Sequence, residues 1–158
     1  MDRQRTLFLK IVIILLGMTV VALCVLWLPW LARSAAEQAP EFAYLQYPVL
    51  IGLYVTAVPF FMALHQAWQL LNYIEKNAAF SELSVSTLNK IKYCGNAIAS
   101  LYTVGTILLL TQNALHPGVA IIGFLVMFTS IVIAVFAAIL QKLLKNALKI
   151  KSENELTI

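Results

Sequence analysis

Charge is scarce in this sequence, and its scarcity excludes a common class of protein. Only 11% of the 158 residues are charged and 61% are hydrophobic, whereas soluble domains carry about 25% charged residues. The mean hydropathy of +0.86 points the same way. These values exclude a soluble globular domain with a large core and predict a chain whose solvent is mostly lipid.

Motifs for catalysis and metal binding are also missing. The chain has two cysteines, Cys24 and Cys94, but no CxxC pair and no Cys/His cluster at metal-ligand spacing. HExxH, GxSxG and P-loop motifs are absent. The two histidines, His65 and His116, fall on different sides of the membrane in the topology argued below. We therefore predict no catalytic residue, no metal site, no cofactor and no enzymatic activity.

Long apolar runs are what the sequence has in abundance. Four of them, at about 11–30, 48–73, 93–112 and 119–140, contain no Asp, Glu, Lys or Arg. A helix needs about 20 such residues to cross a bilayer, and backbone groups in hydrocarbon must be satisfied within the segment. The runs predict an all-α integral membrane protein, a four-helix antiparallel bundle forming one membrane domain over 1–158. A linker at 74–92 and a basic tail at 141–158 lie outside the spans.

Lysines and arginines are distributed unevenly around these runs. If the spans alternate in direction, only Arg33 of the eleven falls on one side, and the other ten fall on the opposite side. The positive-inside rule then places both termini and the linker in the cytosol. Because the cations flank the apolar runs, the net charge of +4 indicates anionic lipid headgroups as the partner, with no direct binding of nucleic acid.

The first run has a second interpretation, a cleaved signal peptide ending at the small residues of "ARSAAE". The apolar core of a signal peptide is about 7–15 residues long. This run is longer and ends in the bulky "LWLPW". We therefore interpret it as a retained span whose tryptophans lie at the outer interface.

The linker carries the signature of a helix start. Ser81 or Ser84 can serve as the N-cap, and the sequence does not decide between them. The simpler interpretation is a capped connector between spans two and three. The functional interpretation is a docking surface for a cytosolic partner, with candidate residues Phe80, Leu83, Leu88 and Lys90.

Polar side chains recur on one face of two spans. One set in span two and another in span three have helical spacing, and the five candidates are His65, Gln69, Asn72, Asn96 and Ser100. The simpler interpretation is hydrogen bonding that holds helices together. The alternative is a small proton or ligand site controlled by His65. Against that alternative, no span contains the carboxylate that proton relays and cation sites usually use.

The tail also has helical periodicity. Leu144 and Leu148 lie on one side and Lys145 and Lys149 on the other, so span four is predicted to continue as an amphipathic helix to about residue 151. A basic amphipathic helix is typical of a membrane-surface anchor, and a docking helix is the alternative. The last seven residues are expected to be frayed.

Several segments resemble a known family. They are "LFLKIVI", "LWLPW", "LLNYIEKNAAFSELSV" and "IKYC", and over about residues 7–150 the chain resembles the YoaS-like family of small bacterial integral membrane proteins of unknown function. The resemblance implies four transmembrane helices, the bacterial plasma membrane, and a small helix-turn-helix regulator as a frequent gene neighbour. Relatives often carry tyrosine in place of His65 and aspartate in place of Glu75, and the family supplies no established functional residue.

Taken together, these patterns predict a non-enzymatic membrane protein with a regulatory or protein-interaction role. The resemblance makes a small DNA-binding regulator the candidate partner. The alternative is a small transporter or channel subunit, which would have to act as a homo-oligomer because four spans leave little room for a pore.

Overall fold

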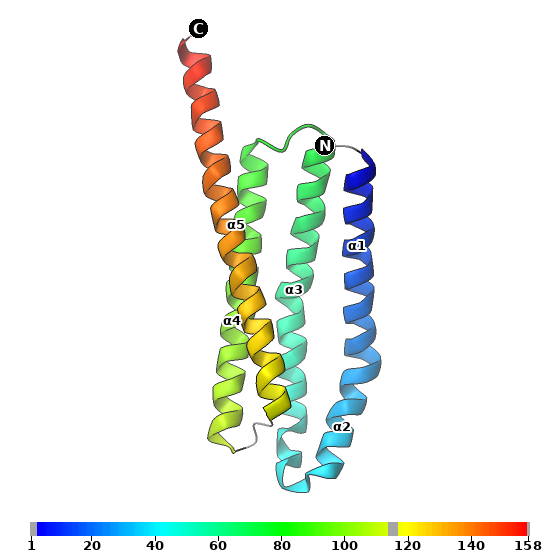
Figure 1. The fold of residues 1–158 in the computed structure, drawn as a ribbon. Helices are drawn as coiled ribbons and strands as arrows, with labels where there is room; N and C mark the ends of the chain where they lie inside the picture. The colour runs from blue at the N-terminus through cyan, green and yellow to red at the C-terminus, as the bar shows by residue number, and fades with distance from the viewer. Residues whose placement is uncertain (1–2, 114–116, 158) are drawn as a thin grey trace.

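The computed structural model describes residues 3–113 and 117–157, which are mostly helical and contain no strand. Residues 114–116, within the predicted turn between spans three and four, lie outside the described residues. The elements in chain order are α1 (Arg3–Ala22), the π-helical turn η1 (Leu23–Trp27), α2 (Leu28–Gln38), the 3₁₀ helix η2 (Pro40–Leu45), α3 (Gln46–Glu75), α4 (Glu82–Thr111) and α5 (Pro117–Thr157). The predicted all-α, four-helix antiparallel architecture is confirmed (Figure 1).

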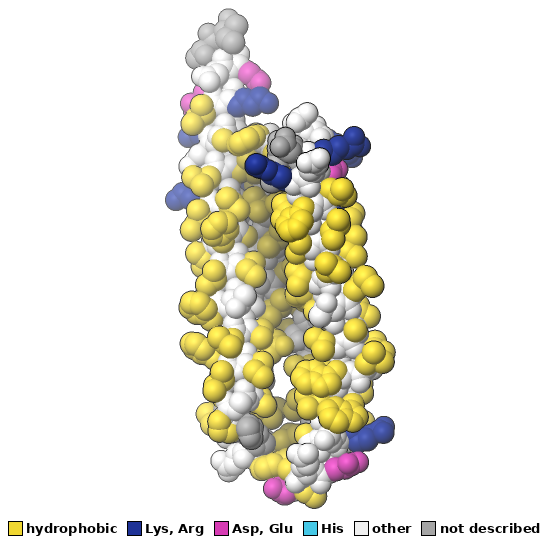
Figure 2. Space-filling model, turned by 45° about the vertical axis from the view of Figure 1, so that its right-hand side comes forward, with side chains coloured by type: hydrophobic (Ala, Val, Ile, Leu, Met, Phe, Trp, Pro, Cys, Tyr) yellow, Lys and Arg dark blue, Asp and Glu magenta, His cyan; other side chains and the backbone are white. Residues whose placement is uncertain are grey.

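Four helical segments are long and apolar enough to cross a membrane, and they are residues 3–38, 40–75, 82–111 and 117–156. Each predicted span lies within one of them, apart from Gln112, which caps α4. Hydrophobic side chains cover the length of the molecule, and charged side chains gather toward its two ends (Figure 2). An apolar girdle between two polar ends is the surface that a bilayer requires.

The helices pack in chain order. α4 packs extensively against α5 and α3, whereas α1 packs mainly against α3. Figure 2 shows a hollow between the column of α5 and the column of α1 and α2. The bundle is therefore open on one side, and α4 is its central element.

Two helices approach closely at Gly95. A Cβ built on Gly95 of α4 would lie 2.9 Å from the Ser130 carbonyl oxygen and 3.1 Å from the Ala134 Cβ of α5. Ala99 and Ala137, which flank this crossing, are also buried. Small residues let two helix backbones approach closely in a membrane, where packing replaces the hydrophobic effect as the driving force.

The π-helical turn after α1 follows from Pro29. The Leu28 N–H donates to the Leu23 oxygen, one residue further back than in an α-helix. The next bond in this pattern would join the residue 29 N–H to the Cys24 oxygen, but proline has no N–H. The Tyr54 hydroxyl of α3 donates to that oxygen instead, at 2.7 Å. This bond ties η1 to α3.

α3 and α4 are each followed by an asparagine in the left-handed conformation, which ends the helix. Asn77 and Asn113 have φ of 57° and 56°, the left-handed conformation that asparagine tolerates better than most residues. At Asn77 the chain reverses, and the Ala78 N–H donates to the Tyr73 oxygen at 2.7 Å. The segment between the first two predicted spans is largely helical, as α2 and η2, and the Tyr44 hydroxyl of η2 donates to Gln112 Oε1 at 2.8 Å.

The tail is longer and more regular than predicted, because α5 continues to Thr157. Gln141 lies level with the start of α4, since its amide Nε2 donates to the Val85 oxygen at 3.5 Å. The residues after Gln141 add roughly 24 Å at 1.5 Å per residue. They continue the axis of α5 beyond the other helices (Figure 1), so the extension stands away from the bundle.

Candidate functional site

The start of α4 is fixed at Ser81. Its backbone is extended, with φ −147° and ψ 162°, and its Oγ accepts a hydrogen bond from the Ser84 N–H at 3.3 Å. The Ser81 hydroxyl in turn donates to the Ala78 oxygen at 2.7 Å. Ser84, the other possible cap in the sequence, is fully buried inside the first turn.

The candidate docking residues fall into two groups. The side chains of Phe80 and Leu83 are 67% and 58% exposed, and Lys90 is also exposed. Leu88, in contrast, is only 6% exposed. Its inclusion in the docking surface is corrected, because it lies on the face of α4 that packs inside the bundle. We call Phe80, Leu83 and Lys90 the linker surface.

The linker surface rests on a well-tied end of the bundle. Lys10 Nζ of α1 lies 3.0 Å from Glu75 Oε2 at the end of α3, and 5.0 Å from the centre of the Trp68 ring. On the other side, Lys92 Nζ donates to Gln141 Oε1 at 3.5 Å, which joins α4 to α5. These contacts tie α1 to α3 and α4 to α5 at the end where the linker lies.

The five polar candidates in the spans are not brought together. His65, Asn96 and Ser100 are exposed on the surface of the protomer, while Gln69 and Asn72 are half-buried. Within the described residues, none of these five side chains has a hydrogen-bond partner. At 1.5 Å per residue, His65 lies roughly 15 Å from the end of α3 and Ser100 roughly 27 Å from the start of α4, so the two sets also differ in depth.

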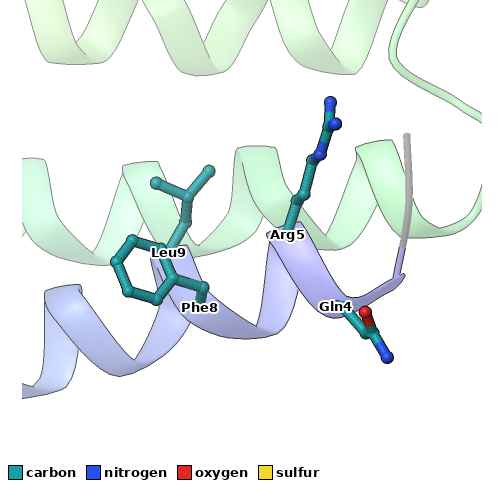
Figure 3. A pocket seen from close by; sticks show the side chains of 4 residues that line it. All are labelled: Gln4, Arg5, Phe8 and Leu9. Atoms are coloured by element: carbon teal, nitrogen blue, oxygen red, sulfur yellow. The ribbon is translucent and has the colours of Figure 1, made fainter.

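The surface hollows are shallow. One, on α3, is lined by Ala57, Val58, Phe61, Met62, His65 and Gln66. The other is formed by Gln4, Arg5, Phe8 and Leu9 of α1 (Figure 3), with Gln4 and Arg5 pointing in opposite directions. Over residues 3–113 and 117–157, no three His, Cys, Asp or Glu side chains are close enough to hold a metal ion. The hollow at Arg5 offers one guanidinium near the bundle end, which suits a lipid headgroup better than a small substrate.

Two contacts of this end were not predicted from the sequence. Gln141 is only 8% exposed and bonds to both Lys92 and the start of α4. Its signal was its spacing after the buried small residues Ser130, Ala134 and Ala137. No sequence pattern indicated the Lys10–Glu75 ion pair, because the two residues are distant in the sequence.

The comparisons with known proteins agree with this architecture. Residues 30–158 match the family described as "Protein of unknown function (DUF2975)". The chain is 51% identical to a Bacillus subtilis (strain 168) protein named "Uncharacterized membrane protein YoaS", over the full length of both. The chain belongs to this family. No solved structure matches it significantly.

Membership in the family confirms the predicted resemblance and the membrane location. The matched residues contain α3, α4 and α5 and exclude α1, so the region described by the family model is the part of the bundle with the most extensive helix packing. Neither comparison indicates an enzymatic family. The chain is a membrane protein with four helices able to span a bilayer.

Proposed function

We propose that this chain is a non-enzymatic protein of the bacterial plasma membrane that docks a cytosolic protein at the linker surface. The observation that carries the proposal is the exposure of Phe80 and Leu83, 67% and 58%, at the bundle end that carries most of the cations. The positive-inside rule assigns this end, with both termini, to the cytosol. Large apolar side chains exposed beyond the spans and rimmed by charge are typical of protein interaction sites.

The rim of the surface favours a folded partner over the lipid surface. Glu82, exposed between Phe80 and Leu83, is repelled by anionic headgroups, and its carboxylate also favours the positive end of the α4 dipole. The α5 extension, which projects beyond the same end of the bundle (Figure 1), also carries exposed apolar side chains, with Leu143 60% and Ile150 59% exposed. We propose a small helix-turn-helix regulator as the partner, because the family resemblance implies such a gene neighbour. Holding it at the membrane would remove it from DNA.

Co-purification from solubilised membranes tests this proposal. A Phe80→Asp/Leu83→Asp variant places two charges in the linker surface without touching a buried side chain. Its matched control is Leu156→Asp, the same chemical change at an 83% exposed position near the tip of α5. We expect the wild type and the control to retain a DNA-binding partner that the double variant loses. Recovery of the same proteins with all three chains would refute docking at this surface.

A second candidate function is a small transporter or channel subunit acting as an oligomer. The observation that favours it is the exposure of His65, Asn96 and Ser100 on segments that cross the membrane, because polar side chains there usually face protein or water. Proteoliposome flux that is lowered by Asn96→Leu and Gln69→Leu would support this function. Flux that is absent, or unchanged in both variants, would exclude it.

A further inference from the structure

One face of α4 has a seam that the protomer leaves uncovered. Its members follow the alternating three- and four-residue spacing of a coiled coil, and all are exposed: Tyr93, Asn96, Ser100, Thr103, Ile107 and Leu110. We call these residues the α4 seam. The other faces of α4 pack against α3 and α5, and Thr103, at the edge of the seam, reaches α5, since its hydroxyl lies 3.1 Å from Met127 Sδ; the remaining seam residues are exposed in the protomer.

Two members of the seam are polar and unpaired. In the described part of the chain, neither the Asn96 carboxamide nor the Ser100 hydroxyl has a hydrogen-bond partner. Thr103 differs, because its hydroxyl donates to the Ala99 oxygen of its own helix at 2.8 Å. Asn96 lies roughly 5 Å and Ser100 roughly 11 Å past Tyr93, where the predicted span begins, so both fall in the predicted span and on the side of it that follows the linker.

We propose that a second copy of this chain covers the α4 seam, in a parallel dimer about a two-fold axis along the membrane normal. Copies inserted in one orientation place Asn96 opposite its own equivalent at the same depth. A carboxamide has both donor and acceptor groups and therefore pairs with itself. A single asparagine at such a position is known to set register and oligomeric state in coiled coils, and membrane helices commonly pack with that geometry.

This proposal goes beyond docking at the linker surface and does not depend on it. The dimer would bury one face of α4 and leave Phe80 and Leu83 available, because Leu83 lies ten residues, almost three helical turns, before Tyr93 at the near end of the seam. It also differs from an apolar contact between bundles. Leu, Ile and Val side chains on other faces are satisfied by lipid, whereas the Asn96 carboxamide is not.

Cysteine cross-linking in native membranes tests the dimer. In a background with Cys24→Ser and Cys94→Ala, Ile107→Cys places one thiol on the seam. Its control is Ile121→Cys on α5, 63% exposed and near the same depth, since Gly123 faces Thr106. We expect a disulfide-linked dimer with Ile107→Cys and little with Ile121→Cys. Equal yields, or no dimer from either, would overturn the proposal.

The polar pair is tested in the same background. Asn96→Leu with Ile107→Cys should lower the association constant of the dimer about eightfold. This is the effect of losing two interhelical hydrogen bonds, related by the two-fold axis, at about 0.6 kcal/mol each. Asn96→Gln keeps the carboxamide and should restore most of the dimer. Unchanged cross-linking in Asn96→Leu would overturn the role of the carboxamide. A seam thiol that links only to another membrane protein would overturn self-association.

Discussion

The tight crossing of α4 and α5 makes a prediction that one methyl group can test. In Gly95→Ala, the new Cβ would lie 2.9 Å from the Ser130 carbonyl oxygen. That atom belongs to a helix backbone, so relief requires the two helices to move apart. Forcing extra methylenes into a packed site typically costs about 1–3 kcal/mol.

Gly105 of the same helix provides the matched control. A Cβ built on it meets nothing within 4 Å, so Gly105→Ala carries only the helix-propensity gain, at most about 1 kcal/mol. Both variants share that gain, and the difference between their free energies of unfolding isolates the steric term. We expect Gly95→Ala to be less stable than Gly105→Ala by about 1–3 kcal/mol.

The assay is unfolding in detergent micelles, followed by tryptophan fluorescence and far-ultraviolet circular dichroism. A larger pair, Gly95→Leu and Gly105→Leu, should widen the difference, because only the first forces a branched side chain against α5. Equal stability of the two alanine variants would refute the close approach of the helices. Greater stability of Gly95→Ala would refute it as well.

Three further outcomes follow from other contacts. Tyr54→Phe removes the donor to the carbonyl left unpaired by the proline of "LWLPW" and should lower the free energy of unfolding by about 0.6–1.7 kcal/mol, measured in the same micelles; no change would contradict the account of the π-helical turn. Ser81→Ala should cost about 1 kcal/mol and increase amide hydrogen exchange at the start of α4, while Ser86→Ala, at an exposed position, should do neither. The orientation is tested with an impermeant maleimide. A thiol at Ala79→Cys should react only after cells are opened, whereas a thiol at Glu37→Cys should react in intact cells. The reverse result would refute a cytosolic linker.

The architecture could be predicted from the sequence because a lipid environment requires long uncharged segments, which are easy to recognise. Uncharged runs of about 20 residues have few alternatives to membrane helices, and the four of them sufficed to predict the bundle. The same signal says little about where a helix ends in water. α2 and η2 were therefore expected as a loop, and the regular end of α5 as a frayed segment.

The linker shows what a sequence leaves undecided. Ser81 and Ser84 both fit a cap, and the choice depends on which one is buried by tertiary packing. Leu88 was predicted for the docking surface together with Phe80 and Leu83, although it is only 6% exposed. Periodicity identifies a face of a helix, but it does not say whether a neighbouring helix covers that face.

Side-chain pairs between helices were the least predictable features. The partner of Tyr54 is the backbone carbonyl of Cys24 in η1, and no residue type at that position identifies it. A proline near the end of an apolar run does predict an unpaired carbonyl four or five residues earlier. The acceptor of this hydrogen bond could therefore be predicted from the sequence. Its donor, the Tyr54 hydroxyl, could not be predicted, because that requires knowing how the first span packs on α3.

The two proposals converge on α4. Its first turn carries part of the linker surface and its outer face carries the α4 seam, so a dimer along the seam would hold two linker surfaces on adjacent rigid helices. Helix-turn-helix regulators commonly act as dimers, and a dimeric partner engaging both surfaces would gain avidity without any new contact. Asn96→Leu should then weaken capture of a dimeric regulator although residue 96 lies roughly 20 Å from Leu83. If capture depends on Phe80 and Leu83 but is indifferent to Asn96, the chain docks its partner as a monomer.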